Sequence, residues 1–93
     1  MKKILIILGH NRFTGVNTWA FTLTKHFNDF GWQCDIGISY SEYDMFGFME
    51  NDTSYAELLY EKKIPMIMNN NIDYNLYDCV ILSYGVHSKK LEN

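Results

Sequence analysis

The sequence predicts an α/β fold, in which a sheet of about four parallel strands packs against helices. Two aliphatic runs, residues 4–8 and 79–84, show no alternation of polar and apolar side chains, which is typical of central strands buried on both faces. Segments with helical and strand patterns also alternate along the chain, and this order favours parallel strands joined by right-handed crossovers.

Residues 14–30 are expected to form a helix that ends at Gly31, where a left-handed residue suits the helix terminus. Its apolar residues share one helical stripe, and we expect this stripe to lie in the core: Val16, Trp19, Ala20, Leu23, Phe27 and Phe30. Residues 34–40 alternate between apolar and polar side chains, which predicts a second strand.

The second half of the chain predicts shorter elements. Ser54 and Glu57 have the spacing of a capping box, which predicts a short helix ending near Lys63. Residues 64–68 are expected to form a strand, and Pro65 suits its first position or a sheet edge. Residues 69–75 are expected to form a polar linker with one helical turn, and residues 88–92 resemble the start of a helix.

An acidic segment, residues 41–52, has no periodicity and is expected to be a loop. It carries a cluster of aromatic and methionine side chains: Tyr43, Met45, Phe46, Phe48 and Met49. This cluster either folds onto its own domain or forms a lid or a surface for a partner.

The expected strand order is 3-2-1-4, with both helices on one face of the sheet. Only residues 69–78 are then available to cross the opposite face, so one face should be incompletely covered. The sequence therefore predicts a single Rossmann-like domain of the three-layer type over residues 1–93.

Composition narrows the function classes. Hydrophobic residues make up 47% of the 93 residues, which excludes a disordered chain, and a formal charge of −3 argues against binding to nucleic acid. No segment approaches the ~18 apolar residues of a membrane span. Cys34 and Cys79 lie far apart in the sequence and are expected to be buried, reduced thiols of a cytoplasmic protein.

The loop after the first strand predicts a site for phosphate or another anion, because it leads from a strand end into a helix N-terminus. Its candidate residues are Gly9, His10, Asn11, Arg12, Gly15, Val16 and Asn17. The guanidinium of Arg12 would add bidentate contacts to an anion. The alternative is that the two glycines only form the turn and that Arg12 is a solvated loop residue.

Three residues at or just past the end of the fourth strand are expected to line the same crevice: Ser83, Tyr84 and His87. His10 and His87 follow neighbouring strands, so each is a candidate general base or substrate ligand, or else polar lining. No third ligand stands beside them, and we expect no metal site.

The first strand and loop, with Thr14-Gly15-Val16-Asn17-Thr18-Trp19 and the later run Phe30-Gly31-Trp32-Gln33-Cys34-Asp35-Ile36, resemble the opening of GT-B glycosyltransferases. The likeness is to the large family 4 and to phage DNA α-glucosyltransferases. Tyr77-Asp78-Cys79-Val80 is similar to a later strand of the same domain. Thr14 departs from the pattern, since many members have glycine there.

The resemblance implies the N-terminal, acceptor-side half of such an enzyme, with Gly15, Val16 and Asn17 in the glycine-loop role. The nucleotide-sugar domain is missing, so this polypeptide should bind a sugar acceptor but should not transfer sugar alone. It would hold no cofactor itself, and a nucleotide sugar would be the donor only if a second domain completed the fold. We therefore expect a truncated domain that needs either a C-terminal domain or a second copy.

Two other functions stay open. The loop 9–18 is also similar to that of flavodoxin-like FMN reductases, which begins Gly-Ser-Pro-Arg, although this chain has no proline there. The other alternative is a small interaction protein without enzymatic activity, which uses its uncovered sheet face or the segment from Tyr43 to Met49 to dimerise or to bind a partner.

Overall fold

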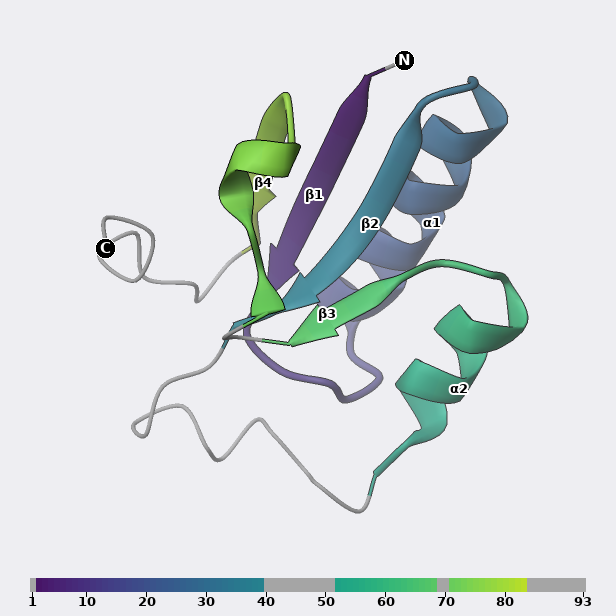
Figure 1. Ribbon diagram of the computed structural model, residues 1–93. Coiled ribbons are helices and arrows are strands. Elements are labelled where there is room, and N and C mark those ends of the chain that lie inside the picture. The colour runs from purple at the N-terminus through teal and green to yellow at the C-terminus, as the bar shows by residue number, and fades with distance from the viewer. Residues whose placement is uncertain (1, 40–51, 69–70, 84–93) are drawn as a thin grey trace.

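The computed structural model describes residues 2–39, 52–68 and 71–83 (Figure 1). The elements along the chain are β1 (Lys3–Leu8), α1 (Gly15–Asp29), β2 (Gln33–Ile38), α2 (Ser54–Glu61), β3 (Met66–Met68), the 3-10 helix η3 (Tyr74–Leu76) and β4 (Cys79–Leu82). The predicted segments around Tyr43 to Met49 and from Tyr84 onward, including the helix start at residue 88, lie outside the described residues.

The sheet has four parallel strands in the order β3-β2-β1-β4, which confirms the predicted fold class. β1 lies in the middle, where Ile6 pairs with Ile36 of β2 on one side and with Ile81 of β4 on the other. The side chains of β1 from Leu5 to Leu8 are fully buried. This strand is therefore the centre of the hydrophobic core, as its unbroken aliphatic run predicted.

Both helices cover the same face of the sheet, as the strand order predicted (Figure 1). Ala20 of α1 and Tyr55 and Leu59 of α2 are buried against a layer of strand side chains that includes Ile6 and Ile36. Burying a side chain of this size contributes about 1.5–3 kcal/mol. This helical layer is the main apolar core of the domain.

The predicted buried stripe of α1 is wrong at two positions. Trp19 is 46% exposed and Phe30 is 78% exposed, whereas the centre of the buried face is formed by Asn17, Ala20 and Thr24. A small residue at position 20 lets the helix approach the sheet closely, so the Trp19 ring falls on the flank of the helix. Phe30 is exposed because it is the C-cap residue, beyond the last turn of α1. Polar side chains can occupy the buried centre because they find partners there, as when the Cys34 thiol donates to Thr24 Oγ1 over 3.6 Å.

The opposite face of the sheet is crossed by the segment around η3. Ile72 packs so tightly against Gly37 that a Cβ there would lie 3.1 Å from the Ile72 Cδ1 atom. The Tyr77 hydroxyl donates to Asp35 Oδ2 over 2.7 Å, and Asp35 is only 4% exposed. This short segment therefore covers the centre of the face that the helices leave open.

The incomplete cover that the sequence predicted lies along β4. Leu82 is 39% exposed, Cys79 is exposed, and Val80 and Ile81 are half-buried. The expectation that Cys79 is buried is therefore wrong, because no described helix packs over this edge strand. Among the described residues, no helix has the length and apolar character needed to cross a bilayer.

The hydrogen bond between Tyr77 and Asp35 should contribute measurably to stability. We expect Tyr77→Phe to lower the free energy of unfolding by about 1–3 kcal/mol, because it leaves a buried carboxylate without its hydroxyl donor. Urea denaturation measures this change. Tyr74→Phe is the matched control, since no described residue bonds to the Tyr74 hydroxyl, and an equal loss in both variants would contradict the role given to the bond.

The two cysteines should differ sharply in reactivity. Burial raises the pKa of the Cys34 thiol to about 11, whereas Cys79 is exposed. Cys34 of β2 and Cys79 of β4 both pair with Ile4 of β1, which lies between them. Two strand spacings, roughly 10 Å, therefore separate their backbones, which is too far for a disulfide bond. Titration with a thiol reagent should show one thiol that reacts fast in the native protein, and the Cys79→Ser variant should lose it. The Cys34 thiol should react only after unfolding, and two fast-reacting thiols in the native protein would contradict this prediction.

Candidate functional site

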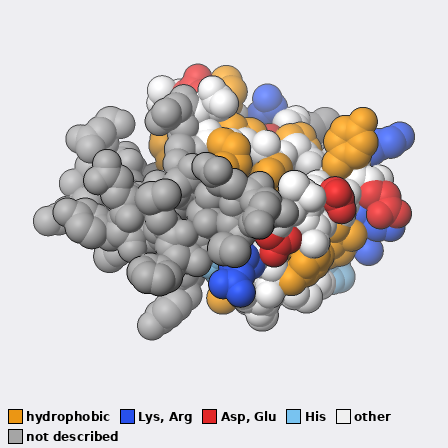
Figure 2. All heavy atoms as spheres, turned by 90° about the horizontal axis from the view of Figure 1, so that it is seen from below, with side chains coloured by type: hydrophobic (Ala, Val, Ile, Leu, Met, Phe, Trp, Pro, Cys, Tyr) orange, Lys and Arg blue, Asp and Glu red, His pale blue; other side chains and the backbone are white. Residues whose placement is uncertain are grey.

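The candidate site lies where β1 and β4 end side by side. The strand order reverses between these two strands, since β2 and β3 extend from β1 in one direction and β4 lies on the other side. In open α/β sheets, ligands bind outside the carboxyl ends of the strands at such a reversal. Figure 2 views the molecule from this end, and its described part shows acidic and basic side chains interspersed.

The loop between β1 and α1 is held by the side chain of Asn17. Its Nδ2 atom donates to the His10 carbonyl over 2.9 Å and lies 3.4 Å from His10 Nδ1. Thr14 caps the helix, because its Oγ1 atom accepts a hydrogen bond from the Asn17 backbone amide. Asn17 is fully buried, so the loop is fixed from inside the protein.

Helix α2 braces the same loop from the side. The Tyr55 hydroxyl, which is buried, donates to the Asn17 carbonyl over 2.7 Å, and the Phe13 ring meets the Tyr55 ring edge-on at 5.4 Å. Asn11 Nδ2 donates to the Asp52 carbonyl over 3.1 Å just before α2 begins. Burial of Tyr55 raises its pKa, so the hydroxyl stays a donor at neutral pH.

Among the described residues, two buried side-chain oxygens near these strand ends have no hydrogen-bond partner. They are Asn17 Oδ1, at the start of α1, and Ser83 Oγ, directly after β4. Asn17 is 0% exposed and Ser83 is 7% exposed. An unpaired buried polar group costs about 1–3 kcal/mol, so two of them at one end of a sheet call for an explanation.

The N-terminus of α1 is open to an anion. Within the described residues, the backbone amides of Gly15 and Val16 have no acceptor, and the first turn carries no acidic side chain. Apart from the adjacent chain, no described residue has an atom within 4 Å of the position that a Cβ would take at Gly9 or Gly15, and neither glycine has a positive φ. The described part of the structure therefore leaves space beside both residues, and neither backbone conformation requires glycine.

His10 is half-buried, and its pKa is lowered, first by burial and then by the charge of Arg12. The Arg12 backbone amide donates to His10 Nδ1 over 3.3 Å. This pattern assigns the ring proton to Nε2 in the neutral form. His10 thus presents an N–H donor at neutral pH rather than the free lone pair of a general base.

The structure brings most of the predicted site residues together. The loop from Gly9 to Asn17 and Ser83 lie at the same end of the sheet, and the Arg12 side chain is exposed there. Tyr84 and His87 lie outside the described residues, so their place in the crevice stays a prediction. Among the described residues, no group of three or more His, Cys, Asp and Glu side chains could hold a metal ion.

Sequence reasoning missed Tyr55 as a support of the loop. Tyr55 lies 38 positions from Asn17 in the sequence, and its pattern indicated only a core residue of a short helix. No local signal could have found this contact, because it depends on how α2 packs beside α1.

Comparison with known proteins gives no match: no family model, no curated protein and no solved structure is similar to this chain at a significant level. The fold and the geometry of the site therefore carry the functional argument.

The pKa of His10 should lie below 6.5, the usual value for histidine. Its folded-state pKa is depressed, so the contribution to stability is present above about pH 6.5 and is lost as the pH falls through the folded value. NMR titration of the ring protons measures this pKa. Arg12→Ala should raise it only part of the way, because burial is the larger cause; a pKa at or above 6.5 in the native chain would contradict the assignment.

Proposed function

We propose that this chain is a Rossmann-like, acceptor-side domain of the GT-B glycosyltransferase type, which binds a hydroxyl-bearing anionic small molecule between the ends of β1 and β4. It binds the acceptor and does not transfer sugar by itself. A transfer reaction would need a nucleotide-sugar domain in addition to this one.

The unpartnered oxygens of Asn17 and Ser83 are the observation that carries the proposal. An amide oxygen only accepts hydrogen bonds, so Asn17 Oδ1 calls for a donor such as a hydroxyl group, which reaches this buried atom only when the groups that cover it move aside. Ser83 Oγ can accept from or donate to the same kind of group. A polyhydroxylated ligand offers several donors at once, which favours a sugar or a sugar-like acceptor.

The helix N-terminus supports the anionic part of the ligand. The free amides of Gly15 and Val16 carry the positive end of the α1 dipole, and Arg12 stands exposed in the same loop. The open space beside Gly9 and Gly15 would let a phosphate or carboxylate approach the backbone. In the proposed role Arg12 adds a charged contact and His10 adds an N–H donor.

The proposal is tested with a variant that affects the ligand but not the fold. Ser83→Ala removes a buried hydroxyl that has no partner, so the free energy of unfolding should stay the same or rise. Binding of glucose 1-phosphate or glucose 6-phosphate, measured by calorimetry, should weaken about fivefold, as expected for one lost hydrogen bond of ~1 kcal/mol.

Charge supplies a matched pair of variants. Arg12→Ala should weaken binding of the same ligands about fivefold or more, whereas Lys25→Ala, which removes an equal charge from the exposed surface of α1, should leave binding unchanged. Equal effects of the two variants would indicate only a general charge effect and would contradict the loop site. Binding of FMN instead of the sugar phosphates would favour the flavodoxin-like alternative. Binding of none of them would favour an interaction protein.

A further inference from the structure

The outer edge of β3 carries unpaired backbone groups. The Ile36 amide donates to the Pro65 carbonyl over 3.0 Å, so the backbone groups of residues 65 and 67 face β2. The N–H and C=O groups of Met66 and Met68 then point away from the sheet. Within the described part of the chain, no hydrogen bond reaches them.

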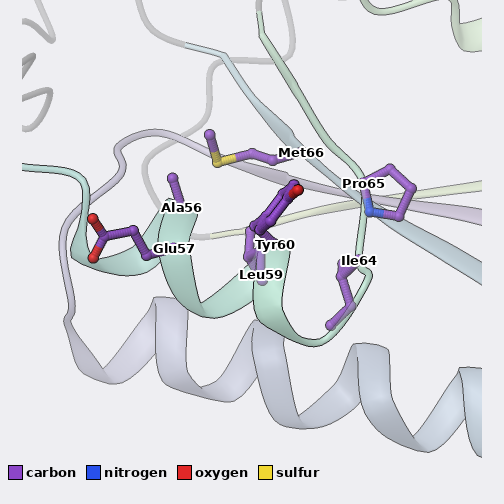
Figure 3. Close-up of a pocket in the computed structure, with 7 residues that line it drawn as sticks. All are labelled: Ala56, Glu57, Leu59, Tyr60, Ile64, Pro65 and Met66. Carbon is purple, nitrogen blue, oxygen red and sulfur yellow. The ribbon is translucent and has the colours of Figure 1, made fainter.

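An apolar hollow lies beside this edge, between α2 and the start of β3 (Figure 3). It has a volume of about 450 Å³, and Leu59, Tyr60, Pro65 and Met66 contribute to its walls. A neighbouring hollow of about 520 Å³ shares Tyr60 and Pro65. Tyr60 is 88% exposed, so a large ring stands in water next to a surface that could take one.

The two ends of α2 differ in net charge. Glu57 lies in the first turn of the helix, whereas Glu61, Lys62 and Lys63 at the other end carry a net charge of +1. Lys63 has a left-handed backbone, with φ at 58°, and this turn leads the chain back into β3. Figure 3 shows Glu57 at one end of the hollow and Pro65, two residues after Lys63 in the chain, at the other.

We propose that this surface binds a second copy of the chain, with β3 paired antiparallel to β3 of the copy about a two-fold axis. The edge lies at the far side of the sheet from β4, so this inference is independent of the proposed ligand site.

Antiparallel pairing satisfies the outward backbone groups completely. With Ile67 facing Ile67 of the second copy at the axis, Met66 of each copy exchanges both hydrogen bonds with Met68 of the other. Because a two-fold axis pairs the same segment of both copies, residues 66–68 of one copy match residues 66–68 of the other in length. The two sheets become one continuous sheet across the axis.

The charges favour a second copy over an unrelated strand. Two-fold symmetry runs the two α2 helices antiparallel, which brings Glu57 of each copy toward the net positive end of the other, where Lys62 and Lys63 outweigh Glu61. Opposite signs therefore meet twice across one surface, and Tyr60 of each copy can cover the apolar hollow of its neighbour. A partner with only one sign of charge would meet repulsion at one end.

Sedimentation equilibrium tests the proposal on the intact chain. We expect a reversible dimer when the concentration rises from about 1 to about 200 µM. Tyr60→Ser should raise the dissociation constant about tenfold without changing the unfolding curve of the monomer, because the ring is exposed there. Leu76→Ser is the matched control, since Leu76 is 57% exposed on η3, away from this edge, and should leave the dimer intact.

A charge exchange tests the orientation of the two copies. Glu57→Lys alone and the double variant Lys62→Glu, Lys63→Glu should each dimerise about tenfold more weakly, because like charges then meet across the axis. An equimolar mixture of the two should recover the affinity of the native chain. Three results would overturn the proposal. The first is a monomer at every concentration, which would favour a strand of another protein as the partner of this edge. The others are a dimer lost in Leu76→Ser but not in Tyr60→Ser, and a mixture of the two charge variants that dimerises no more tightly than either variant alone.

Discussion

Burial of β1 on both faces is the constraint on which the rest of the structure depends. A parallel strand with aliphatic side chains on both sides needs two covering layers, and this chain supplies them unequally. Within the part of the chain that the structure describes, helices α1 and α2 form one layer, and the short segment around η3 forms the other. The second layer is thin, so it relies on specific contacts rather than area: Ile72 against Gly37, and Tyr77 bonded to the buried Asp35.

The core and the candidate site share a buried polar residue. Asn17 lies in the face of α1 that packs on the sheet, yet its amide holds the loop at His10 and its carbonyl receives the Tyr55 hydroxyl. A loop anchored in this way to both helices pays little ordering entropy when a ligand arrives. The unpartnered Oδ1 atom is then the part of the residue that the fold does not use.

The fold could be predicted because its signals are local: the apolar runs at residues 4–8 and 79–82, and the return of apolar residues at helical spacing. The second run correctly predicted a strand, but its expected burial on both faces is wrong, because β4 lies at the sheet edge with Cys79 and Leu82 exposed. The position of Trp19 could not be predicted, because the side that α1 turns to the sheet depends on the small Ala20 and on Thr24 meeting Cys34. For the site, the loop followed from its place between a strand and a helix. The lack of a hydrogen-bond partner for Ser83 Oγ among the described residues could not be predicted from the sequence, because it depends on how the side chains pack.

The pairing of β1 with β4 has a consequence for how the chain folds. The Lys3 amide donates to Asp78 Oδ2, a contact that spans 75 positions of sequence. Closing a loop of this length is slow compared with forming the β1-α1-β2 unit. Until β4 arrives, one edge of the most hydrophobic strand is unpaired, and another chain could pair with it. Aggregation during refolding should therefore depend on the arrival of β4 more than on the stability of the finished domain.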